Sequence, residues 1–215
     1  PADASWGDGG VVAAPMDPIT AGAPDPNRIA VAADALRGGA RTAIIVGDAI
    51  AGDPDLLADV SWIGAATGAK VFGETFPARM RRGAGLPGLE RVAYLAEFAQ
   101  MQLDGIEHLV TLGAKAPASF FAYPGKPSDL LPEGCVVTAL VEPGDDVRAA
   151  VAGLLDAVDT SDVEVPRVNR SRPESPVGAL TGESLAAAVG ALLPEDAIVA
   201  DEANTTGLWL NGATA

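Results

Sequence analysis

Two residue types on which many protein sites depend are scarce in this chain. Among 215 residues there is one cysteine, Cys135, and one histidine, His108. A single cysteine excludes an intrachain disulfide, and the two residues together cannot supply a cysteine- or histidine-rich metal site. We therefore expect Cys135, inside the apolar stretch CVVTALV, to be a small buried core residue in a protein of a reducing compartment. We expect His108 to open a strand and to have no catalytic role.

Basic residues and long apolar runs are also few. The chain has 14 basic and 29 acidic residues, which gives a net charge of −15. Such a surface repels phosphate backbones and anionic lipid, so we expect neither nucleic acid nor a membrane as a partner. No apolar run approaches the roughly 18–20 residues of a membrane span. The first ten residues, PADASWGDGG, lack the pattern of a signal peptide, so we expect a cytoplasmic protein. Because the sequence starts on Pro rather than Met, we expect a cut or processed end.

Apolar strands alternate with amphipathic helices through most of the chain. Asp25-Pro26 and Asp53-Pro54 each offer a capping carboxylate followed by a proline suited to the first helical position, and Gly68 can end the second helix. The predicted strands are 42–46, 70–72, 108–112 and 135–141, and the predicted helices are 26–37, 54–67, 89–105 and 146–158. This alternation predicts an α/β fold with a doubly wound, mostly parallel, Rossmann-like sheet.

The last third of the chain indicates a change of domain. Residues 159–180 carry three prolines and many polar groups without a helical period, which is typical of a linker. An amphipathic helix over 183–193 and an apolar run, AIVA at 197–200, then predict the first helix and strand of a second α/β domain. Alternatively, 181–215 could pack back on the first domain as an extra strand. Residues 1–25 have no period and are interpreted as a linker into the first domain.

Three glycine-containing loops could hold a ligand, and each has a simpler interpretation. GDGG at 7–10 could present an aspartate to Mg²⁺, but no strand precedes it and a turn is favoured. VGDAIAGD at 46–53 follows a strand, where phosphates bind in doubly wound folds, yet it lacks the GxGxxG spacing, and a plain turn is favoured. The loop at 113–128 carries Phe120, Phe121 and Tyr123, which could either line a ligand site or cover the sheet.

The polar stretch DEANTT at 201–206 follows the predicted strand 197–200. Its amide and hydroxyl groups could donate hydrogen bonds to phosphate oxygens. A capping turn before the next helix is the other interpretation of the same residues, and taken alone it is slightly favoured.

Together these segments resemble the middle of a thiamine diphosphate-dependent enzyme of the acetolactate synthase and benzoylformate decarboxylase group. The resemblance covers essentially the whole chain and is strongest in LTGESLAAAVGALLPEDAIVADEANTTG at 180–207 and around 119–135. It implies that residues 1–25 link to an absent N-terminal pyrimidine-binding domain, 26–158 form the central domain, 159–180 are a linker, and 181–215 start a truncated diphosphate-binding domain.

The resemblance also implies site residues, cofactors and partners. Asn204 and Thr205 are the best candidates for contacts to the cofactor diphosphate, with Glu202 and Thr206 behind them. The cofactors of the parent protein would be thiamine diphosphate and Mg²⁺, whereas FAD is doubtful because the turn at 46–53 has no special features. The partners would be a 2-oxo acid such as pyruvate and further copies of the chain, in a homodimer or homotetramer.

Catalysis is expected of the parent protein and not of these 215 residues alone. The family's activating glutamate and its GDG-containing metal motif belong to other parts of the family sequence, so we expect no catalytic and no metal-binding residue in this chain. The parent would decarboxylate pyruvate or a similar acid and form a C–C bond, as an acetolactate synthase large subunit does. A different class of function also fits the fold: a stand-alone module that binds FAD or ADP without catalysis.

Overall fold

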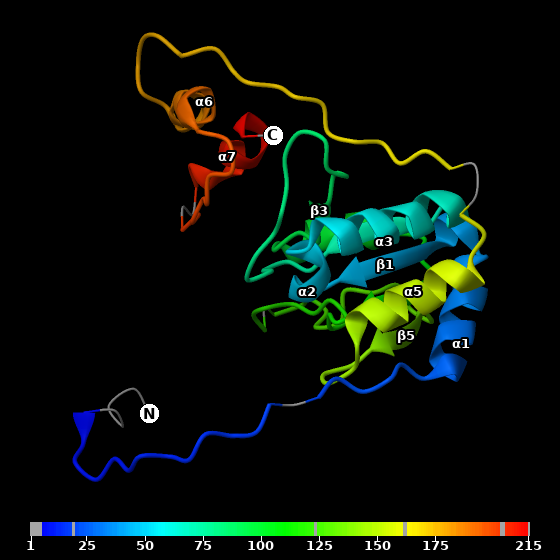
Figure 1. Ribbon diagram of the computed structural model, residues 1–215. Helices are drawn as coiled ribbons and strands as arrows, with labels where there is room; N and C mark the ends of the chain where they lie inside the picture. The colour runs from blue at the N-terminus through cyan, green and yellow to red at the C-terminus, as the bar shows by residue number, and fades with distance from the viewer. Residues whose placement is uncertain (1–5, 19, 123, 161–162, 203–204, 215) are drawn as a thin grey trace.

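Five parallel strands form the sheet at the centre of the computed structural model, which describes residues 6–18, 20–122, 124–160, 163–202 and 205–214 (Figure 1). The strands are β1 (Thr42–Val46), β2 (Lys70–Gly73), β3 (Glu90–Arg91), β4 (His108–Leu112) and β5 (Val136–Val141), and their order in the sheet is β3-β2-β1-β4-β5. Every neighbouring pair is parallel. The predicted α/β fold with a doubly wound sheet is confirmed.

The central strand β1 is buried on both faces. All five of its residues are buried, and it pairs in register with β2 on one side and β4 on the other. Successive side chains of a strand point to opposite faces, so Ile44 and Val46 enter one apolar cluster while Ala43 and Ile45 enter another. A continuous β-branched strand of this kind is stable only where both faces are covered.

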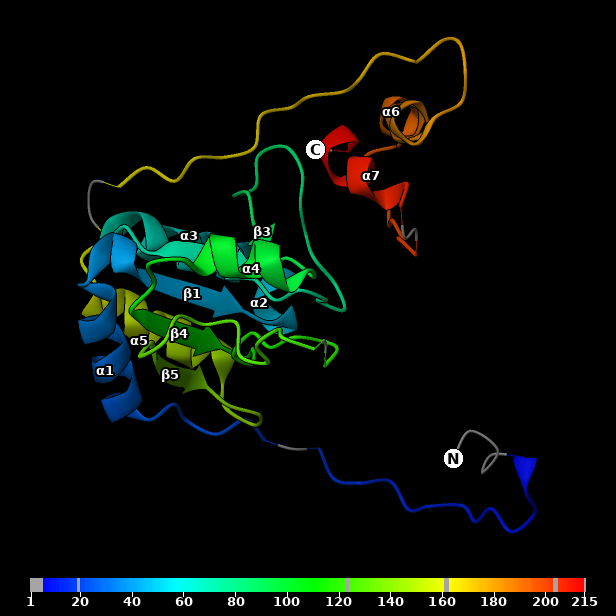
Figure 2. The ribbon, with the colours of Figure 1, turned by 180° about the vertical axis from the view of Figure 1, so that it is seen from behind.

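Helices cover the two faces unequally. The helices α1 (Pro26–Leu36), α3 (Pro54–Thr67) and α5 (Val147–Ala157) pack over the face that includes Ile44. Among the described residues, α4 (Ala96–Leu103) is the one helix that covers the opposite face, as Figure 2 shows, together with Leu130 from the loop before β5. A fifth, short helix, α2 (Asp48–Ala51), directly follows β1.

The predicted helix starts are confirmed. Asp25 accepts a hydrogen bond from the backbone of Asn27, and Asp53 accepts from the backbones of Asp55 and Leu56. A proline follows each capping aspartate, and Gly68 ends α3 with a left-handed φ of 74°. Aspartate side chains satisfy backbone N–H groups that have no partner inside the helix.

Two local predictions are wrong. Residues 89–105 do not form one helix, because Glu90 and Arg91 pair with β2 as the short edge strand β3, and α4 begins only at Ala96. Helical periodicity across this stretch merges a two-residue strand with the helix that follows it. Cys135 is only partly buried, since it precedes β5 at the border of the second cluster, and burial raises the pKa of its thiol.

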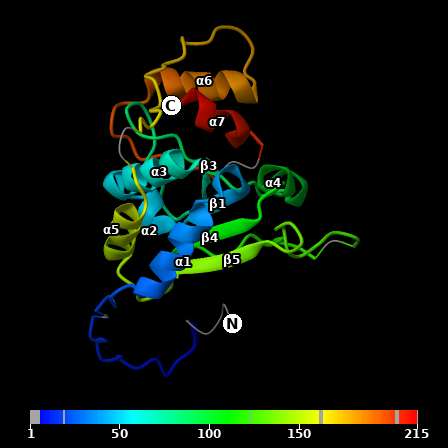
Figure 3. The same cartoon turned by 90° about the vertical axis from the view of Figure 1, so that its right-hand side faces the viewer.

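In the C-terminal segment, the residues that the structure describes form helices and no strand. The helices α6 (Gly182–Leu192) and α7 (Gly207–Ala213) lie beside each other and apart from the sheet, beyond the linker (Figures 1 and 3). Their contact is close, because a Cβ at Gly190 would lie 1.9 Å from the carbonyl oxygen of Ala213. Residues 197–200, predicted as a strand, are extended without a strand partner, and Ile198 is 97% exposed. The alternative of an extra strand on the central sheet is therefore wrong for the residues that the structure describes.

The cluster beneath α5 gives a direct test of the fold. We expect Leu154→Ala to lower the free energy of unfolding by about 2–5 kcal/mol, because the side chain is fully buried between α5 and the sheet and leaves a cavity. The measurement is urea unfolding followed by circular dichroism. Leu180→Ala is the matched control, since Leu180 is 80% exposed. If this control changed the free energy of unfolding by more than about 0.5 kcal/mol, the contrast between a buried Leu154 and an exposed Leu180 would be contradicted.

Candidate functional site

The point at which the strand order reverses lies between β1 and β4. In doubly wound sheets this point, at the carboxyl ends of the strands, is where ligands usually bind. Here Gly47 follows β1 and donates a backbone hydrogen bond to Leu112 at 3.0 Å. A Cβ at Gly47 would lie 2.1 Å from the carbonyl oxygen of Gly113. The backbones of the two turns therefore pack directly against each other, which leaves no room for a side chain at position 47.

Two carboxylates lie close together beside this point. Burial, and secondarily the charge of Asp48, raises the pKa of Glu74 above its ordinary value of 4.5, while a hydrogen bond from the Asp48 backbone partly opposes the rise. The Asp48 carboxylate also accepts a hydrogen bond from the backbone of Ala78 and so holds the loop between β2 and β3. Sequence reasoning did not single out Glu74. Its position directly after β2 was the available signal.

The raised pKa of Glu74 predicts a pH dependence of stability. A carboxyl group whose pKa is higher in the folded state than in the unfolded chain favours folding when protonated, so its contribution is lost as pH rises above about 4.5. We expect Glu74→Gln to gain stability relative to the parent chain as pH rises from the ordinary carboxyl pKa of 4.5 through the raised pKa of Glu74. The measurement is urea unfolding at a series of pH values.

A variant of the neighbouring carboxylate separates the two causes. Asp48→Asn keeps an acceptor for Ala78 and removes the like charge, so it should reduce the pH-dependent advantage of Glu74→Gln without abolishing it, because burial is the larger cause. A stability advantage of Glu74→Gln that does not change with pH would contradict the raised pKa of Glu74.

Aromatic rings from three loops form an exposed cluster near the same end of the sheet. Phe76, Tyr94 and Phe120 have centroid separations of 5.0–5.6 Å, and Phe121 lies 6.3 Å from Tyr94. Each of the four is between 44% and 60% exposed. The two phenylalanines of the loop at 113–128 thus pack on other aromatic rings and do not cover the sheet, a role that Leu130 takes. Tyr123 lies outside the described residues.

The predicted diphosphate loop lies beside α7. Glu202, Thr205 and Thr206 are exposed, and Thr206 directly precedes the first residue of α7. Asn204 lies outside the described residues. The backbones of Leu208 and Trp209 donate to the carbonyl oxygens of Thr205 and Thr206. These contacts form a turn that begins a helix, and the contribution of its side chains to cofactor binding stays a prediction.

Arginine side chains approach this loop from the central sheet. Arg82, in the loop between β2 and β3, donates hydrogen bonds to the carbonyl oxygens of Asn211 and Thr214, each at 3.1 Å. Burial and the charge of Arg91 lower the pKa of Arg82, and the charge of Asp201 opposes this. Asp201 of the predicted diphosphate loop is therefore within electrostatic reach of Arg82. Sequence reasoning missed Arg82, although ARMRR at 78–82 is a basic run in an acidic chain.

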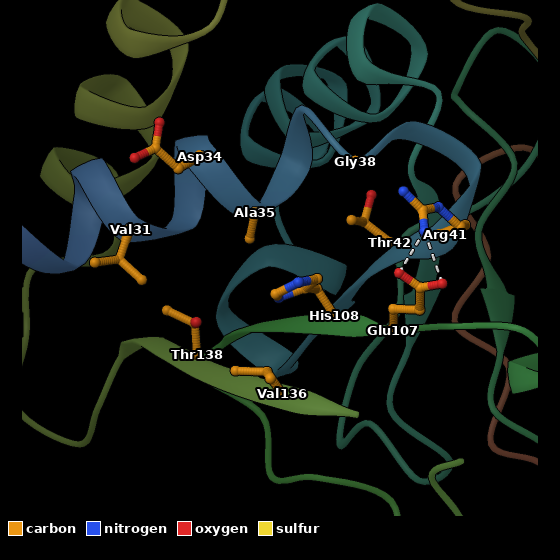
Figure 4. Close-up of a pocket in the computed structure, with 10 residues that line it drawn as sticks. All are labelled: Val31, Asp34, Ala35, Gly38, Arg41, Thr42, Glu107, His108, Val136 and Thr138. Carbon is orange, nitrogen blue, oxygen red and sulfur yellow. Dashed lines mark hydrogen bonds and ion pairs between the residues drawn. The ribbon is translucent and has the colours of Figure 1, made fainter. Parts of the chain in front are cut away.

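His108 lies at the opposite edge of the sheet. Figure 4 shows it in a hollow of about 370 Å³ between α1 and the amino-terminal ends of β4 and β5. At the rim, Arg41 and Glu107 form an ion pair in which Nη1 of Arg41 lies 2.6 and 2.8 Å from the two carboxylate oxygens of Glu107. The other lining residues are the carboxylate Asp34 and a set of small or aliphatic side chains: Val31, Ala35, Gly38, Thr42, Val136 and Thr138. The hollow lies far along the strands from the carboxyl edge where ligands of this fold bind.

The described part of the chain offers neither a metal-binding cluster nor a membrane-spanning helix. Within it, no group of three or more His, Cys, Asp or Glu side chains is arranged to hold a metal ion. No helix in the same residues combines the length and the apolar character needed to cross a bilayer. The GDGG stretch is exposed in the extended N-terminal segment, away from the sheet (Figure 1).

Comparison with known proteins gives one relative in sequence and several in structure. The chain is 48% identical over all 215 residues to a protein of Mycobacterium tuberculosis that is named, provisionally, as the acetolactate synthase large subunit IlvX, and it spans 41% of that protein. The fold is similar to that of a 4-hydroxybenzoylformate decarboxylase from Rhodococcus jostii, with a TM-score of 0.62 at 19% identity, over 92% of this chain and 40% of that one. Benzoylformate decarboxylase from Polynucleobacter necessarius matches at 0.52 and 17% identity, over 82% and 36%. No protein-family model matches the chain.

Proposed function

We propose that the chain is a segment of a protein of the thiamine diphosphate-dependent enzyme family, and that the complete protein is a 2-oxo acid carboligase or decarboxylase, similar to an acetolactate synthase large subunit. The observation that carries the proposal is the 48% identity, which extends over the whole chain and corresponds to less than half of the relative. The doubly wound sheet is consistent with it, although a fold by itself does not fix a function.

The domain organisation follows the same proposal. Residues 26–158, which contain the sheet, are assigned to the central domain, and residues 159–180 to the linker after it. Residues 181–215, with α6 and α7, are assigned to the start of the diphosphate-binding domain, and 1–25 to the connection from a pyrimidine-binding domain. The family's activating glutamate and metal motif have no counterpart in these residues, so we propose that the 215 residues alone have no catalytic activity.

The donor groups of the loop at 201–206 are suited to a diphosphate. Hydroxyl groups of Thr205 and Thr206 are exposed at the start of α7, and hydroxyl and amide groups are effective donors to phosphate oxygens. Asn204 and Thr205 are proposed as the direct contacts, with Glu202 and Thr206 in support. Two carboxylates in the same loop, Asp201 and Glu202, would repel a diphosphate by themselves, so the loop needs compensating positive charge. Mg²⁺ and Arg82, whose charge interacts with Asp201, would supply it.

The bound cofactor would supply the electron sink that makes decarboxylation of a 2-oxo acid possible, while the protein binds and orients. Pyruvate or a similar acid is the proposed substrate, and a homodimer or homotetramer in the cytoplasm is the proposed state. FAD is not included in the proposal, because the turn at 46–53 lacks the GxGxxG spacing.

The proposal is tested by calorimetric titration of the complete protein with thiamine diphosphate and Mg²⁺. We expect saturable binding, and we expect Asn204→Ala and Thr205→Val each to raise the dissociation constant by about tenfold, because each removes a hydrogen bond to a charged group. Ser175→Ala, at an exposed linker position, is the control and should bind as the parent protein does.

A complete protein that binds no thiamine diphosphate would contradict the proposal. A yellow preparation, or an adenine nucleotide released on denaturation, would then favour the alternative of a nucleotide-binding module. Unchanged affinity in both loop variants, with binding intact in the parent, would contradict only the residue assignment.

A further inference from the structure

The loop between β2 and β3, residues 74–89, connects the central sheet to both later segments of the chain. Its Gly85 and Leu86 exchange backbone hydrogen bonds with Val168 of the linker, each at 2.9 Å. Arg167 of the linker adds a bond of 2.6 Å to the carbonyl oxygen of Gly85. In Figures 1 and 2 the loop rises from the sheet to α7. We name residues 74–89 the bridging loop.

Arg82 makes the contact between the bridging loop and α7. Its guanidinium donates to the carbonyl oxygens of Asn211 and Thr214 and to the hydroxyl oxygen of Thr214. These carbonyl groups lie at the C-terminal end of α7, where backbone acceptors have no partner inside the helix and a positive charge is favoured. The side chain is partly buried. One residue of the central sheet region therefore caps a helix more than a hundred residues later in the chain.

The position of α7 determines the position of the predicted diphosphate loop. Thr206 precedes α7 without a break, and α7 is only seven residues long. A short rigid helix held at one end transmits that constraint to the loop at its other end. The ring of Trp209, in the first turn of α7, packs closely against α6: a Cβ at Gly182 of α6 would lie 3.0 Å from it. Arg82 and α6 thus hold α7 from two directions.

We propose that Arg82 is a positioning residue for cofactor binding: by capping α7 it holds Thr205 and Thr206, which lead into that helix, in place against the central domain. This inference rests on the proposed function and extends it to a residue outside the diphosphate loop. Its positive charge also acts on that loop directly, since Asp201 is close enough to raise the pKa of Arg82. The planar guanidinium is required because it directs several N–H groups at fixed angles, which a lysine cannot do.

The experiment measures the dissociation constant of thiamine diphosphate, with Mg²⁺ present, for variants of the complete protein. We expect Arg82→Gln to weaken binding by about tenfold, since it removes charge-assisted hydrogen bonds. Arg82→Lys should recover part of the affinity, because the charge remains while the forked geometry is lost. Arg81→Gln is the matched control: it removes the same charge from an adjacent, exposed position, and its dissociation constant should stay within about twofold of the parent value.

A second variant distinguishes positioning from a general loss of structure. Thr214→Val removes the hydroxyl that Arg82 contacts, so it should weaken binding in the parent protein and have little further effect in Arg82→Gln, as expected for coupled residues. Circular dichroism and the unfolding midpoint establish that each variant is folded. If Arg82→Gln binds as Arg81→Gln does, or if the effects of Arg82 and Thr214 simply add, the inference is overturned. If the parent protein itself binds no cofactor, the proposed function fails and the inference fails with it.

Discussion

The requirement to bury β1 on both faces determines the rest of this structure. A parallel strand at the centre of a sheet needs hydrogen-bonded neighbours on two edges and apolar cover on two faces. Here β2 and β4 supply the edges, three helices cover one face, and α4 with Leu130 covers the other. Once these contacts form, the carboxyl ends of the strands meet at one edge, and the loops that follow them become neighbours.

The functional interest of that edge lies in the loop after β2 and not in the turn after β1. The turn after β1 is closed by the contact of Gly47 with Gly113. The bridging loop instead extends to the linker and to α7, and it carries Arg82 to the end of that helix. On the present proposal, the central domain contributes to a cofactor site of the next domain by holding that domain's first elements.

The sequence allowed prediction of the elements whose signals are local. Capping aspartates followed by proline mark the starts of α1 and α3, and unbroken apolar runs mark β1 and β4. The prediction failed where tertiary pairing decides. Edge strand β3 has only two residues, too few for any period, and its identity depends on β2. Arg82 was missed for the same reason, since its partners lie more than a hundred residues away.

The run at 197–200 is the instructive case. Its composition predicts a buried strand, yet Ile198 is 97% exposed and the described residues provide no strand to pair with it. A strand needs neighbours, and an apolar sequence cannot form one alone. On the present account those neighbours belong to the rest of a diphosphate-binding domain.

Amide hydrogen exchange at residues 197–200 tests that account most directly, compared between the complete protein and the 215-residue chain. The account predicts strong protection in the complete protein, where the run is a paired strand, and fast exchange in the shorter chain. Equally fast exchange in both would contradict it, because the run would then not be the first strand of a second domain.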